Sequence, residues 1–152
     1  MTTDLEGVKI GFPQIVPMVG TLGMEFLELS ESRAVMRLPD QKDFHNHLGG
    51  LHAGAMFTLA ESASGALVLA NFAERMADAT PLAVEATIRY HKLAMGAVVA
   101  TATLSRPGTE ILAELDEGRR PEFAIEIAIA TEDGTVTGEM TITWTLKPNR
   151  RP

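Results

Sequence analysis

The chain has 152 residues, of which 45% are hydrophobic and 22% charged, so its length and composition predict a single globular domain. Its formal net charge of −7 disfavours binding to nucleic acid or to an anionic membrane surface, because both need a basic surface. Cysteine is absent, which excludes disulfides, thiolate metal ligands and a cysteine nucleophile.

The first half of the chain predicts a lead-in segment, a hairpin and one long helix. Residues 5–17 predict a short helix or an irregular segment broken by Pro13 and Pro17. The start of the chain lacks the features of a signal peptide, so we expect a cytoplasmic protein. Apolar and polar residues alternate over 23–40, which indicates a β-hairpin. Residues 53–76 contain no proline and much alanine, which favours a helix.

The second half of the chain is predicted to be mostly strand. Residues 81–94 and 97–105 form two strands, and Thr109 caps a short helix that ends at Gly118. Residues 123–146 predict a hairpin with a tight turn. The apolar residues of the long helix lie on most sides of it, so we expect this helix to be buried on most sides. We therefore expect an α+β fold, with an antiparallel sheet of about six strands wrapped around one long central helix.

Glu61 is the one charged residue in the apolar part of the long helix, and no lysine or arginine lies between residues 43 and 74. Burying an unpaired carboxylate is costly. At 100° per residue, Gly54, Thr58 and Gly65 share the face of Glu61, which leaves room for another chain or a ligand. These residues alone leave two alternatives open, a functional acid or a glutamate that faces solvent or pairs with an arginine.

The start of the same helix offers a second group of candidate residues. His52 and Glu61 fall on opposite faces, roughly 13 Å apart along the axis, so we expect them to cooperate only between subunits or from the helix start. The first-turn amides of Ala53 and Gly54 lack acceptors within the helix and can bind an oxyanion.

Other chemistries have weaker support. His45, His47 and His52 lack a carboxylate at matching spacing for a metal site. Ser62 and Ser64 lack the G-x-S-x-G motif of a serine hydrolase. We expect no metal and no cofactor.

Five residues around the start of the long helix form one sequence pattern. The pattern N-x-x-G-x-x-H-x-G-x-x-x-x-x-x-E consists of Asn46, Gly49, His52, Gly54 and Glu61. It resembles the signature of the hotdog-fold acyl-CoA thioesterases of the phenylacetate-pathway (PaaI-like) group. The resemblance covers nearly the whole chain and implies one hotdog thioesterase-like domain over residues 1–152.

The resemblance implies a role for each of these positions. Glu61 activates water or attacks the carbonyl of an acyl-CoA thioester, and Asn46 positions the nucleophile or the thioester. The amide of Ala53 stabilises the oxyanion, while His52 and Gly54 shape the thioester pocket. Because the site of such proteins lies between two subunits, the expected partner is a second copy, in a homodimer or a dimer of dimers.

Basic residues on one predicted strand are candidates for binding the phosphates of coenzyme A. Arg89, His91 and Lys92 form this patch, to which Arg106 is a further candidate. Solvated charges at a strand edge explain the same residues equally well.

Three positions differ from the family pattern. Many relatives have a second glycine where this chain has Ala53 and an aspartate where it has Glu61. Some relatives have a hydroxyl residue near the position of Ala83.

Two alternative functions remain open. A non-catalytic acyl-CoA or fatty-acyl binding protein is one alternative. A hydroxyacyl dehydratase that pairs His47 with Glu61 is another.

Overall fold

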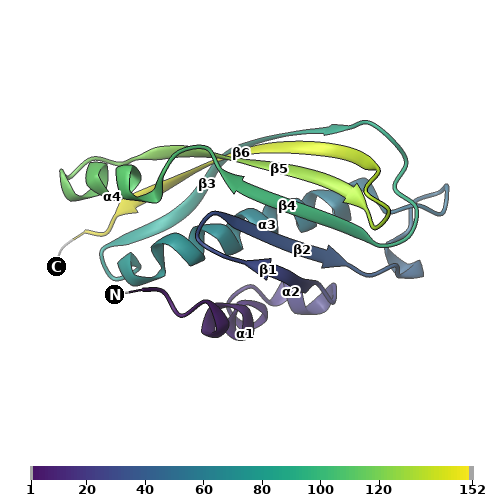
Figure 1. Ribbon diagram of the computed structural model, residues 1–152, viewed down its shortest axis with the longest axis horizontal. Helices are drawn as coiled ribbons and strands as arrows, with labels where there is room; N and C mark the ends of the chain where they lie inside the picture. Colours follow the sequence, from purple (N-terminus) through teal and green to yellow (C-terminus); the bar gives the residue numbers. More distant parts are fainter. Residues whose placement is uncertain (1, 151–152) are drawn as a thin grey trace.

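The computed structural model describes residues 2–150. In it, one long helix packs against a six-stranded antiparallel sheet, and shorter helices surround them (Figure 1). The strands follow the order β1-β2-β4-β5-β6-β3 across the sheet. The elements are α1 (Leu5–Ile15), α2 (Pro17–Thr21), β1 (Glu25–Leu29), β2 (Arg33–Leu38), η1 (Lys42–Phe44), α3 (Ala53–Phe72), η2 (Ala73–Arg75), β3 (Ala79–Tyr90), β4 (Val98–Leu104), α4 (Gly108–Asp116), β5 (Glu122–Thr131) and β6 (Val136–Pro148). The predicted α+β architecture is confirmed.

Helix α3 forms the centre of the core. It contacts every strand of the sheet, and Leu59, Ala63 and Leu67 on it are fully buried. Small side chains such as Ala63 let the strands approach the helix closely. The stretch Ala53–Arg75 is long and apolar enough to cross a membrane by composition, but here more than half of it is buried within the protein. The prediction that this helix is buried on most sides is confirmed.

The N-terminal segment is more helical than its prolines predict. Helix α1 continues two residues beyond Pro13, and Pro17 is the first residue of α2, a position where proline is favourable. Phe12 is buried and packs against Phe26 at a ring-centroid distance of 5.7 Å. This contact joins α1 to β1, and α1 also contacts α3, on the side below the sheet in Figure 1.

The short helix α4 begins before its predicted cap. Pro107 occupies the N-cap position and Thr109 lies inside the helix, so the predicted capping role of Thr109 is wrong. Gly108 explains this start, because a Cβ atom there would lie 2.8 Å from Oδ1 of Asn71. Only glycine lets the chain turn into α4 so close to the end of α3. Gly118, with a φ of 79°, ends the helix region as predicted.

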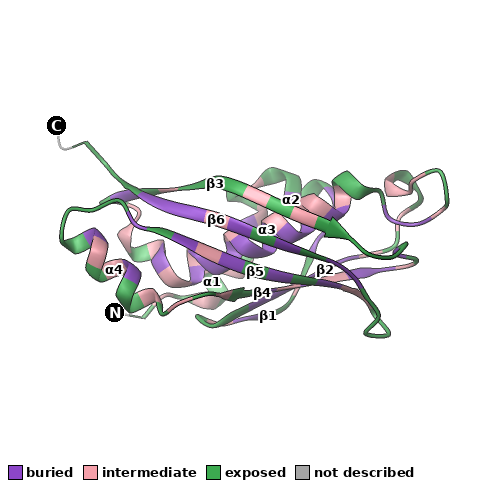
Figure 2. Cartoon of the chain, turned by 90° about the horizontal axis from the view of Figure 1, so that it is seen from above, coloured by how far each residue is buried: buried purple, intermediate pink, exposed green. Residues whose placement is uncertain are grey.

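Strand β3 lies at one edge of the sheet and pairs only with β6 (Figure 2). Its ladder is irregular between Ala83 and Glu85, so that Val84 has no partner on β6. The apolar side chains of Leu82, Val84 and Tyr90 are exposed. A long edge strand with exposed apolar side chains is a surface that favours pairing with another chain.

Candidate active site

Glu61 lies beside an apolar cleft of about 200 Å³, which we call the Glu61 cleft. Its walls come from α1, α3, β3 and β6 and include Phe12, Pro81 and Trp144. Apart from Glu61 and Ser62, every residue that lines the cleft is apolar or glycine. The side chain of Glu61 is therefore neither free in bulk solvent nor packed into the core.

The carboxyl group of Glu61 has no hydrogen bond or ion pair to any residue in 2–150. Burial raises the pKa of the Glu61 carboxyl above its ordinary value, because the apolar surroundings disfavour the charged form. A carboxylate that titrates closer to neutral pH is a stronger base than an exposed one. A pKa raised by burial next to a cleft is a common feature of functional acids.

Trp144 is held in place as a wall of this cleft by hydrogen bonds. Its Nε1 donates to Oγ of Ser64 at 3.0 Å, and that hydroxyl donates to the backbone oxygen of Glu61 at 2.6 Å. The hydroxyl of Ser64 is thus used inside the core and is not free to act as a nucleophile. Through this hydroxyl, the indole ring of Trp144 is fixed next to the helix turn that carries Glu61.

A second hollow lies at the start of α3, and we call it the loop cleft. It has a volume of about 340 Å³, and Asn46, Ala53, Tyr90 and Lys92 are among the residues that line it. The hydroxyl of Tyr90 donates a hydrogen bond to the backbone oxygen of Ala53 at 3.0 Å. The end of β3 is thereby joined to the first turn of α3.

The side chain of Asn46 builds the loop that precedes α3. Its Oδ1 accepts hydrogen bonds from the amides of Leu48 and Gly50 at 2.9 and 3.1 Å. Between them, Gly49 adopts a φ of 79°, a conformation that favours glycine. The structure therefore assigns the oxygen of Asn46 to the loop, and its Nδ2 is 3.4 Å from the backbone oxygen of Leu51.

His52 is the N-cap residue of α3, and its Nδ1 accepts a hydrogen bond from the amide of Gly54 at 2.8 Å. This bond occupies one of the two amides predicted to bind an oxyanion. The amide of Ala53 donates to no residue within 2–150, and the residue is exposed. Of the first two amides of α3, that of Ala53 is therefore the one available to a ligand.

The two groups of predicted catalytic residues are separated within one chain. Glu61 lines one cleft, whereas Asn46 and Ala53 line the other. Glu61 lies eight positions after Ala53 in α3, which corresponds to about 12 Å along the axis. One copy of the chain does not bring Glu61 to the free amide.

The predicted basic patch is divided by the structure. Lys92 lines the loop cleft, Arg89 is opposite Glu139 in the backbone register of β3 and β6, and Nε2 of His91 is 3.5 Å from a carboxylate oxygen of Glu139. Neither Arg89 nor Lys92 forms an ion pair within the described range 2–150. Both cations remain available for an anionic ligand at this end of β3.

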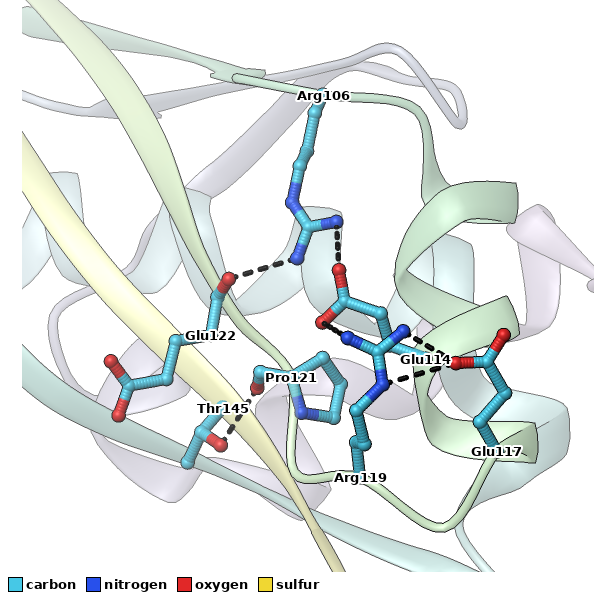
Figure 3. Close-up of polar contacts among 7 residues, drawn as sticks. All are labelled: Arg106, Glu114, Glu117, Arg119, Pro121, Glu122 and Thr145. Atoms are coloured by element: carbon cyan, nitrogen blue, oxygen red, sulfur yellow. Dashed lines mark hydrogen bonds and ion pairs between the residues drawn. The ribbon is translucent and has the colours of Figure 1, made fainter.

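Arg106 does not belong to this patch, so its predicted role is wrong. Its guanidinium donates to the carboxylate of Glu114 at 2.6 Å and to the backbone oxygen of Glu122 at 3.0 Å (Figure 3). Arg106 thus joins α4 to the start of β5. Lys92 follows the far end of β3, at the opposite end of the sheet.

The remaining histidines do not assemble a site. His45 pairs with Asp40, with 2.6 Å between Nε2 and Oδ1, and His47 is exposed and lines neither cleft. Within residues 2–150, no three histidine or carboxylate side chains gather in a way that could hold a metal ion.

Several residues of the two clefts were not singled out as site residues from the sequence, and four of them shape the clefts most clearly. Phe12, Pro81 and Trp144 line the Glu61 cleft, and Tyr90 holds Ala53. The alternation of β3 and β6 indicates that Tyr90 and Trp144 lie on a sheet face, but no local pattern says which helix turn each one contacts.

Solved structures with the same arrangement define the class of fold. A probable thioesterase from Pseudomonas aeruginosa, PA5026, is 27% identical with a TM-score of 0.86, and the alignment covers 98% of this chain and 99% of that one. A thioesterase family protein from Silicibacter pomeroyi is 21% identical with a TM-score of 0.75, covering 95% and 99%. A mutant of thioesterase PA1618 from Pseudomonas aeruginosa is 21% identical with a TM-score of 0.72, covering 98% and 97%. The protein therefore has the hotdog fold, and its structural relatives include proteins named as thioesterases.

The family assignment comes from the sequence. The chain belongs to the family described as "Domain of unknown function (DUF4442)", whose pattern matches residues 6–146. No curated protein matches the chain.

Proposed function

We propose that this protein is an acyl-CoA thioesterase whose active site forms between two copies of the chain. The observation that carries the proposal is the carboxyl group of Glu61, which is unpaired within residues 2–150 and lies in an apolar cleft. The free amide of Ala53 at the start of a 20-residue helix supplies the complementary group for an oxyanion. The resemblance to the PaaI-like thioesterases supports the same pair of residues.

The edge strand β3 suggests how two copies meet. Pro81 lies at the Glu61 cleft near one end of this strand, and Tyr90 holds Ala53 at the other end. When two β3 strands pair antiparallel about a twofold axis near their centres, the Pro81 end of one copy lies beside the Tyr90 end of the other. This pairing brings Glu61 of one copy towards Ala53 of the second copy.

The proposed reaction is hydrolysis of the thioester bond. The Glu61 carboxylate takes a proton from water as the water oxygen attacks the carbonyl carbon, and the amide of Ala53 in the second copy stabilises the negative oxygen. The C–S bond then breaks, the proton passes to the departing sulfur, and a carboxylic acid and a thiol are released. In the alternative with Glu61 as nucleophile, a carboxylate oxygen bonds to the carbonyl carbon, the C–S bond breaks and the thiolate leaves as the thiol after taking up a proton. Water then cleaves the mixed anhydride to the carboxylic acid and the free Glu61 carboxylate.

Lys92 and Arg89 are proposed to bind the phosphates of coenzyme A. Lys92 lines the loop cleft next to Ala53, so a phosphate there would extend away from the reacting carbonyl. Both cations lack an ion-pair partner in the described part of the chain, and an incoming phosphate would therefore displace no carboxylate.

The proposal is tested with purified protein and a panel of acyl-CoA esters, with release of free thiol as the readout. We expect saturable turnover of at least one ester. Binding of acyl-CoA without any thiol release would contradict hydrolysis and favour the acyl-CoA binding alternative. Hydration of an enoyl-CoA ester would favour the dehydratase alternative.

The proposed interface is tested by placing a charge on the free edge of β3. We expect Val84→Glu to convert the dimer to a monomer and to remove thioesterase activity, because a charge on an edge strand blocks pairing. Light scattering after gel filtration measures the mass. Val136→Glu is the matched control, since Val136 is 52% exposed and Val84 49%. Equal masses for Val84→Glu and the parent would exclude this interface.

A further inference from the structure

The Glu61 cleft extends beyond the carboxyl group as an apolar slot between α1 and α3. Phe12 and Val16 line the slot from α1 and its C-cap, Val68 lines it from α3, and Trp144 lines it from β6. Glu61 is the only charged residue on its lining. A slot of this kind excludes a polar or charged group and accepts a hydrocarbon chain.

The volume of the slot limits what it can hold. A cavity of about 150 Å³ accepts benzene, which has six carbons. The Glu61 cleft, with about 200 Å³, has room for one or two carbons more. Phe12 is a fixed part of the lining, because it is 2% exposed.

Gly65 forms part of the wall, one helix turn beyond Glu61. A Cβ atom at this position would lie 3.8 Å from Cζ of Phe12 and 3.8 Å from the ring of Trp144. This is ordinary van der Waals contact, so an alanine fits the folded structure without a clash. The added methyl group would instead occupy space within the slot.

We infer that the slot between α1 and α3 binds the acyl chain of the substrate, that it fits chains of about six to eight carbons, and that Gly65 sets its size. The inference rests on the proposed function, because it places the thioester carbonyl at Glu61. The acyl chain then points away from the loop cleft, where the coenzyme A part would lie.

The experiment compares Gly65→Ala with the parent on a series of straight-chain acyl-CoA esters from two to sixteen carbons. We expect the parent to be most active with about six to eight carbons. We expect Gly65→Ala to lower kcat/KM for these esters about tenfold or more relative to esters of four carbons and fewer, because a misplaced methylene in an apolar pocket costs about tenfold or more. Val16→Ala should shift the optimum in the opposite direction, towards longer chains.

Gly11→Ala is the matched control, because Gly11 also lies in a helix and a Cβ atom there meets nothing within 4 Å. Denaturant midpoints at or above that of the parent show that both glycine variants fold, since alanine favours a helix. An unchanged chain-length profile in Gly65→Ala would overturn the inference and leave thioesterase activity standing.

A binding assay separates failure of the inference from failure of the proposed function. Non-hydrolysable acyl-CoA thioethers of the same chain lengths are titrated into parent, Gly65→Ala and Gly11→Ala proteins. Tight binding of six- to eight-carbon thioethers that Gly65→Ala alone weakens supports the slot even if no ester is hydrolysed. Binding that is independent of chain length would contradict it.

Discussion

Glu61→Gln is expected to lower thioester hydrolysis by about 10² to 10⁴-fold, because a general base in the transition state contributes this factor. The amide is close in size to the carboxyl group, so the cleft keeps its shape. Release of thiol from the best acyl-CoA ester measures the effect. Glu110→Gln, at an exposed position in the first turn of α4, is the control and should leave activity unchanged. Equal activity of Glu61→Gln and the parent would remove Glu61 from the mechanism.

The same substitution is expected to stabilise the protein at neutral pH. Because burial raises the pKa of Glu61, the folded state binds its proton more tightly than the unfolded state. The free energy of unfolding of the parent therefore falls as pH rises from the unfolded value, about 4.3, through the higher folded value. Glu61→Gln does not lose this free energy. Its gain in the free energy of unfolding over the parent should therefore be full above the folded pKa of Glu61 and absent at pH 3. Urea unfolding across this range measures it.

Ala53→Pro is expected to lower kcat by about 10² to 10³-fold, the cost of removing one oxyanion donor. The substitution removes one amide hydrogen from the first helical position, where proline is well tolerated. His52 already has a φ of −58° and ψ of 136°, which suits a residue before proline. The helix and its cap should therefore persist, and circular dichroism checks this.

Ala53→Gly is the matched control for this prediction. It keeps the amide hydrogen and introduces the second glycine that many relatives carry, so activity should equal or exceed that of the parent. If Ala53→Pro hydrolysed the ester as fast as Ala53→Gly, the first amide of α3 would not be the oxyanion donor.

The sequence predicts the fold well because its strongest patterns are local. The alternation over residues 123–146 and the long run of small apolar residues around Glu61 each specify one element, and both elements form as predicted. Pro13 and Thr109 were misjudged because tertiary contacts decide there. Phe12 packs α1 against the core despite the proline, and the close approach of Gly108 to α3 fixes where α4 begins.

The site was predictable in part. The sequence places Glu61 on a face of small residues, and the structure puts that face beside an apolar cleft. The sequence could not indicate that the ring of His52 accepts a hydrogen bond from the amide of Gly54 and leaves the amide of Ala53 free, because this depends on the rotamer of His52. Nor could it exclude Arg106 from the basic patch, since its partner Glu114 lies on the inserted helix.

The most direct test of a shared site mixes two inactive variants. Glu61→Gln retains the amide of Ala53, and Ala53→Pro retains the carboxylate of Glu61, so a mixed dimer contains one site with both groups intact. Subunit exchange at equal amounts gives half mixed dimers, each with one of two sites active, and predicts about a quarter of the parental activity. A mixture no more active than the average of its two components would show that Glu61 and Ala53 do not act together across two copies of the chain.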